Sequence, residues 1–111
     1  RTFLWPRRAA PMISYTVHCS FADADIQASF TRYLVTEHVT EVCAVSGATA
    51  TLVTIDGERA CEVRYVFRSR DDLEAYLADD APRMREHALR HMGTPPRVTV
   101  TRRTGEIIHP L

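Results

Sequence analysis

The strongest constraint on the fold of this chain is the order in which strand-like and helix-like hydrophobic patterns follow one another. Residues 12–21 alternate apolar and polar side chains, and this period of two predicts a strand with one buried face. Residues 24–45 have the apolar spacing of an amphipathic helix. Residues 48–55 are rich in β-branched side chains, Asp56-Gly57 is a hairpin-turn signal, and residues 61–67 alternate again. The first half of the chain therefore predicts a strand, a helix and a β-hairpin.

The second half of the chain predicts another helix and a last strand. Ser69, followed three residues later by Asp72, is typical of a helix start because a serine hydroxyl accepts a free backbone N–H there. Pro82 cannot continue a helix interior, so we expect a break and a second helical segment to about Met92. Residues 97–108 predict the final strand. This order is typical of the ferredoxin-like α+β fold, a four-stranded antiparallel sheet with two helices on one face.

The alternation within each strand assigns its residues to one of the two sheet faces. The apolar set should point toward the helices: Ile13, Tyr15, Val17, Cys19, Cys61, Val63, Tyr65, Phe67, Val98 and Val100. The opposite face should be polar: Ser14, Thr16, His18, Glu62, Arg64, Val66, Thr99, Thr101 and Arg103. No predicted helix covers this second face, so it is the surface on which we look for a partner or a ligand.

The first predicted helix has an apolar stripe that changes direction. Its first half places four residues on one buried face: Ile26, Phe30, Tyr33 and Leu34. At 100° per residue the same stripe continues onto Glu37 and Glu41, which are charged. The later apolar residues lie on another side, beside His38: Val35, Val39, Val42 and Val45. The helix therefore bends near residues 36–38, or it has two neighbours that contact different faces.

Bulk composition bounds the class of protein. A chain of 111 residues fits one domain, which we place at residues 12–108, with residues 1–11 as a disordered or extraneous extension. Fourteen basic and fourteen acidic residues cancel, so neither nucleic acid nor a membrane surface is expected as a partner. The three cysteines are far apart and contain no C-x-x-C pair, so we expect reduced thiols in a cytoplasmic protein.

Four segments resemble a known bacterial family: MISYTV, TEHVTEV, RSRDDLEAYL and DDAPRMREHALRHMG. The chain resembles the domain-of-unknown-function family number 4286 over about residues 12–107. That family belongs to the dimeric α/β-barrel superfamily, alongside antibiotic-biosynthesis-type monooxygenases. The resemblance implies a homodimer that packs sheet against sheet and carries no established activity with it.

The uncovered sheet face holds the first candidate site. His18, Glu62 and Arg64, flanked by Thr16 and Thr101, could bind an anionic or phenolic ligand in a chamber between two sheets. The same residues could equally form a cross-strand ion pair that only stabilises the sheet. The sequence leaves both interpretations open.

His38 is the second candidate. The resemblance implies that it lies at the barrel mouth, where it could act as general base or hydrogen-bond donor, while Val39 and Val42 contact a neighbour such as the partner chain. The alternative is a structural histidine at a helix kink, bonded to a backbone carbonyl or to Glu41.

His87 and His91 have the i, i+4 spacing of a metal clamp, but no third ligand is evident, so we predict no metal site. No cofactor is predicted, although no observation decides against haem. Two functions remain. The chain is a homodimer that binds, with or without converting, a small cyclic or aromatic metabolite, or it is a non-catalytic dimerisation or regulatory module. Whether it is an enzyme stays open.

Overall fold

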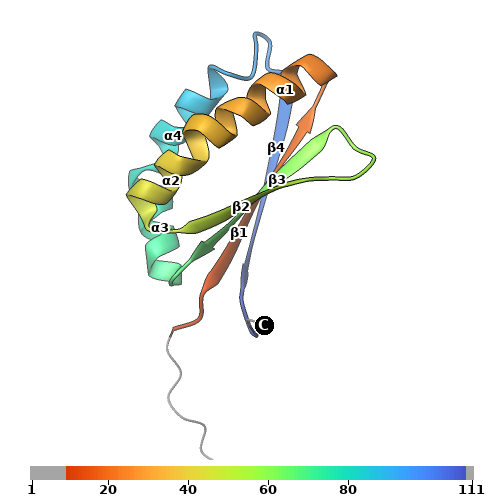
Figure 1. The fold of residues 1–111 in the computed structure, drawn as a ribbon. Helices are drawn as coiled ribbons and strands as arrows, with labels where there is room; N and C mark the ends of the chain where they lie inside the picture. Colours follow the sequence, from red (N-terminus) through yellow and green to blue (C-terminus); the bar gives the residue numbers. More distant parts are fainter. Residues whose placement is uncertain (1–9, 110–111) are drawn as a thin grey trace, which may run out of the picture.

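The computed structural model describes residues 10–109. The predicted extension, residues 1–11, falls almost wholly outside them. The helices and strands follow the predicted order: β1 (Ile13–Phe21), α1 (Ala24–Tyr33), η1 (Leu34–His38), α2 (Val39–Ser46), β2 (Thr49–Thr54), β3 (Ala60–Phe67), α3 (Arg70–Asp79), α4 (Ala81–Leu89) and β4 (Val98–Glu106). The strands form one antiparallel sheet in the order β2-β3-β1-β4. Figure 1 shows all helices on one side of this sheet. The ferredoxin-like prediction is confirmed.

Short polar contacts set the helix boundaries. Asp23 caps α1, since its carboxylate accepts the backbone N–H of Ile26 at 2.9 Å. Ser69 caps α3 in the predicted way, accepting the N–H of Asp72 at 3.1 Å. The chain leaves α2 through Gly47, whose φ of 74° is the left-handed conformation that glycine adopts without strain. Caps recognisable in the sequence therefore fix where three of the helices begin or end.

The segment after Pro82 ends earlier than predicted. Helix α4 stops at Leu89 instead of about Met92. Each of the next three N–H groups bonds the carbonyl three residues back, as in Met92 N–H to the Leu89 carbonyl at 3.1 Å. This tighter winding differs from the four-residue spacing of an α-helix, and it leads into the turn before β4.

The core lies between the helices and the inner sheet face. Most of the residues predicted to point toward the helices are buried: Ile13, Tyr15, Cys19, Cys61, Val63, Tyr65, Phe67 and Val98. Leu73, Tyr76 and Met84 close the core from α3 and α4. Val17 and Val100 pack against this core but are only partly buried. Within residues 10–109, no helix is both long enough and apolar enough to cross a bilayer.

The change of stripe in the first helix has a definite structural cause. Residues 34–38 form a π-helix, in which the N–H of Val39 bonds the carbonyl of Leu34, five residues back. A π-segment accommodates one extra residue, which turns every later side chain about 100° relative to the earlier ones. This inserted residue explains the discontinuity for which a bend or two neighbours was predicted. After it, α2 packs on α3 and β2.

Because of the inserted residue, the later valines do not all lie where they were predicted. Val42 is 1% exposed and belongs to the core of its own chain, so its predicted contact with a partner chain is wrong. Val39 packs partly against the same core, whereas Val35 and Val45 are exposed. The rotation brings Val42 inward and leaves Glu37 and Glu41 in solvent.

Candidate functional site

A cavity lies between the helices and the sheet, on the covered face. It leaves about 50 Å³ for solvent-sized molecules, inside a hollow of about 410 Å³ that includes its open mouth. The walls are mostly apolar and combine residues of β1, β3, β4, α1, η1, α4 and the turn after α4: Val17, Cys19, Phe30, Leu34, His38, Val63, Tyr65, Arg85, Ala88, Met92, Val100 and Arg102. Three of the lining side chains are short, namely Val17, Val100 and Ala88.

The π-segment places His38 in the wall of this cavity. Its Nδ1 lies 3.4 Å from the hydroxyl of Tyr33, five residues earlier in the helix. Burial lowers the pKa of His38, with Arg102 and the two histidines His87 and His91 acting in the same direction and Glu41 opposing them. The imidazole is therefore neutral near pH 7. Its bond to Tyr33 replaces the predicted alternative of a bond to a backbone carbonyl or Glu41.

Tyr33 is itself held from the other side. Its ring stacks on His91, from the turn after α4, with centroids 3.8 Å apart and planes 13° apart. Burial raises the pKa of the Tyr33 hydroxyl, and the carboxylates of Glu41 and Glu37 raise it further. Tyr33 thus stays a neutral phenol, and its position is fixed between His38 and His91.

Two arginines that sequence reasoning missed also line the cavity. Arg102 lies opposite Val17 in the β1–β4 register, so it points to the inner face. Arg85 projects from α4 and donates to the hydroxyl of Tyr15 at 3.2 Å. Both were detectable, since Arg102 follows Val98 and Val100 in the period of two and Arg85 follows Ala81 by one helical repeat. Both arginines are exposed, so their charges alone did not mark them as cavity residues.

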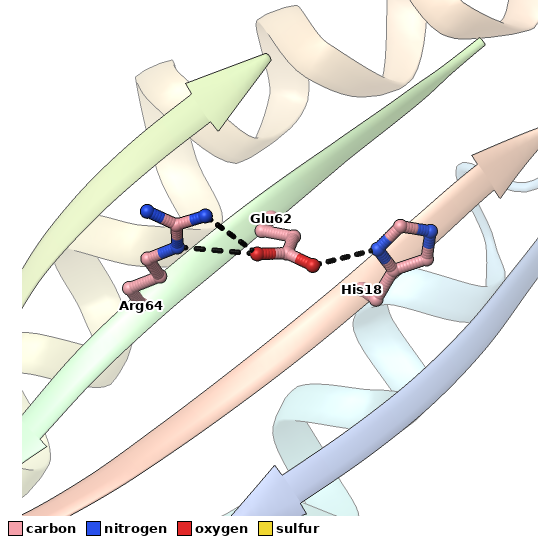
Figure 2. A network of polar contacts seen from close by, with 3 residues as sticks. All are labelled: His18, Glu62 and Arg64. Atoms are coloured by element: carbon pink, nitrogen blue, oxygen red, sulfur yellow. Dashed lines mark hydrogen bonds and ion pairs between the residues drawn. The ribbon is translucent and has the colours of Figure 1, made fainter. Parts of the chain in front are cut away.

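Three residues of the predicted site on the uncovered face form a polar network centred on Glu62 (Figure 2). Glu62 Oε2 lies 2.9 Å from Nδ1 of His18, and Glu62 Oε1 accepts from Nε and Nη2 of Arg64 at 3.1 and 2.9 Å. His18 faces Glu62 on β3 and Thr101 on β4, while Thr16 faces Arg64. The five residues are therefore neighbours on one face, as predicted. The sheet separates them from His38, with which they share no cavity.

The hydrogen bonds within this network satisfy the carboxylate. The Glu62 side chain is 11% exposed, and the bonds from His18 and then Arg64 lower its pKa. Both oxygens already have protein partners. As it stands in one chain, the network stabilises the sheet, and its role in ligand binding stays a prediction.

Two cysteines of the inner sheet face are core side chains. Cys19 and Cys61 are buried and face each other across β1 and β3. Their mutual hydrogen bond is the main cause that raises the pKa of the Cys19 thiol, so Cys19 enters the cavity wall as a small neutral side chain. Among residues 10–109, no three histidine, cysteine or acidic side chains group closely enough to hold a metal ion.

Comparison by sequence matches no protein family model and no curated protein. The fold matches solved structures over nearly their whole length. A dimeric ferredoxin-like protein from an uncultured marine organism is 15% identical, with a TM-score of 0.68 over 91% of this chain and 99% of that one. SnoaB, a cofactor-independent oxygenase from Streptomyces nogalater, is 16% identical, with a TM-score of 0.62 over 92% and 98%. A monooxygenase from the gene ActVA-Orf6 of Streptomyces coelicolor, in complex with nanaomycin D, is 14% identical, with a TM-score of 0.64 over 91% and 94%.

These likenesses establish the fold. The chain has the architecture of the dimeric ferredoxin-like proteins and of the monooxygenases built on it. Membership of family number 4286 stays a prediction, because no family model matches. Identities of 14 to 16% transfer no residue role to this chain.

Proposed function

We propose that this protein is a homodimer that binds a small cyclic or aromatic molecule in the cavity between its helices and its sheet. The observation that carries the proposal is the cavity wall itself, in which aromatic and aliphatic side chains surround one neutral histidine, His38. Concave apolar walls with a few convergent polar groups are the usual form of a small-molecule site. The proposal therefore moves the ligand from the uncovered sheet face to the covered one.

Solved structures of the same fold support a small-molecule function. SnoaB is described as a cofactor-independent oxygenase, and the Streptomyces coelicolor monooxygenase holds nanaomycin D. In the stronger form of our proposal, the bound molecule is also converted, with no cofactor. The cavity residues would orient the ring and exclude water, and His38 would contact its polar group. We also propose that the chain is a member of family number 4286 and that it is located in the cytoplasm.

Dimerisation through the uncovered sheet face is the second half of the proposal. That face carries the network of His18, Glu62 and Arg64, and no helix within residues 10–109 covers it. The first solved structure compared is described as dimeric. If the cavity takes no ligand, this dimer alone would make the chain a dimerisation or regulatory module.

A cavity-filling substitution tests the ligand site. Ala88→Leu places extra volume in the cavity wall, and Ala78→Leu on the exposed side of α3 is the matched control. Calorimetric titration with 2-naphthamide should show binding to the wild type and to Ala78→Leu, and at least about a tenfold loss in Ala88→Leu. Light scattering should give twice the 12.6 kDa chain mass for all three proteins. Equal binding by Ala88→Leu and the wild type would exclude the cavity as the site for such rings.

A further inference from the structure

The cavity has an unusual balance of polar groups. Its charged or strongly polar members are His38, Arg85 and Arg102, and no carboxylate lines it. The two guanidinium groups are donors only. Among the described residues neither arginine takes part in an ion pair, and the partner of Arg85 is the neutral hydroxyl of Tyr15. Two positive charges at an apolar wall therefore lack a negative counterpart within the described chain.

The contact of His38 with Tyr33 favours one of the two imidazole tautomers. Tyr33 contacts Nδ1, and both groups are neutral. A phenol O–H is a stronger acid than the N–H of a neutral imidazole, so the favoured arrangement has Tyr33 donating to Nδ1. We therefore expect the imidazole proton on Nε2, the nitrogen that Tyr33 does not contact. His91, stacked on Tyr33, holds the donor in place.

We propose that the cavity binds a planar aromatic ligand as its anion, a carboxylate, phenolate or enolate, whose charged oxygen is held by Arg85, Arg102 and the Nε2–H of His38. The three groups come from α4, β4 and η1, so they approach the cavity from different walls. A hydrogen bond between a guanidinium and a carboxylate is about twice as strong as one between neutral groups. This inference rests on the proposed function and adds the chemical class of the ligand.

Two probes of the same shape test the charge requirement. 2-Naphthoate is an anion at neutral pH, whereas 2-naphthamide is neutral and nearly isosteric. We expect calorimetric titration of the full chain to give at least about tenfold tighter binding of 2-naphthoate. Arg102→Gln should abolish that preference while keeping the affinity for 2-naphthamide. Arg103→Gln is the matched control, because its register partner Thr16 places it on the opposite sheet face.

The possible failures are distinguishable. Equal affinity for both probes, or a preference that persists in Arg102→Gln, would overturn the anion inference and leave the aromatic site standing. Binding of neither probe would overturn the proposed function as well.

The tautomer of His38 gives an independent readout. We expect the ¹⁵N chemical shifts of His38 to report a protonated Nε2 in the wild type, and Tyr33→Phe to remove this bias. A protonated Nδ1 in the wild type would take His38 out of the donor set and contradict its assigned role.

Discussion

Glu62 is the residue with the most closely defined surroundings on the uncovered face. Its two oxygens divide their bonds between His18 and Arg64, on the neighbouring strand and on its own. The three side chains were predictable as neighbours, because the alternation in each strand places them on one face. Whether they bind a ligand or only one another was not predictable. That depends on differences of about an ångström in the distances between their polar atoms.

Substitution of Glu62 should reveal this pairing through its pH dependence. Because the pKa of Glu62 is lowered in the folded chain, its pairing stabilises the fold above about pH 4.5. This stabilisation is lost as the pH falls through the pKa that Glu62 has in the folded chain. We expect Glu62→Gln to lower the free energy of unfolding by about 0.5 to 1 kcal/mol at about pH 5.5, and by less at about pH 3.5. Urea denaturation at the two pH values measures the difference.

Ser20→Ala, on the same face at the end of β1, provides the control and should show no such pH dependence. A Glu62→Gln deficit that is equal at both pH values would show that the ionised carboxylate contributes nothing.

At the scale of secondary structure, the π-segment connects the sequence to the site. It turns Val42 into the core and His38 into the cavity wall within one helix. The sequence predicted the place of the discontinuity, because charged residues interrupt the apolar stripe there. It could not predict a π-segment, since a kink or a second neighbour satisfies the same hydrophobic pattern.

The rotation after the π-segment predicts opposite outcomes for two valines. Val42 is 1% exposed and Val45 is 44% exposed. Val42→Asp buries an unpaired charge and should destabilise the fold by more than about 3 kcal/mol. Val45→Asp should change stability by no more than about 0.5 kcal/mol. Thermal and chemical denaturation of the two variants provide the comparison, and similar losses would mean that α2 is rotated differently.

At the scale of the whole molecule, the two sheet faces carry different groups of side chains. The covered face encloses the cavity with His38, Arg85 and Arg102, and the uncovered face carries the polar network around Glu62. Strand order and facing were predictable from periodicity and turn signals. The position of the cavity was not, because it results from a local shortage of side-chain volume between layers that hydrophobic patterns treat as filled.

The most direct test of the ligand site is a crystal structure of the protein with bound 2-naphthoate. We expect the ring between η1, α4 and the inner sheet face, with its carboxylate near Arg85, Arg102 and His38. We also expect two copies of the chain to pack through their uncovered faces. A ring bound between those faces, against His18, Glu62 and Arg64, would contradict the covered cavity as the site and restore the uncovered face as the place of binding.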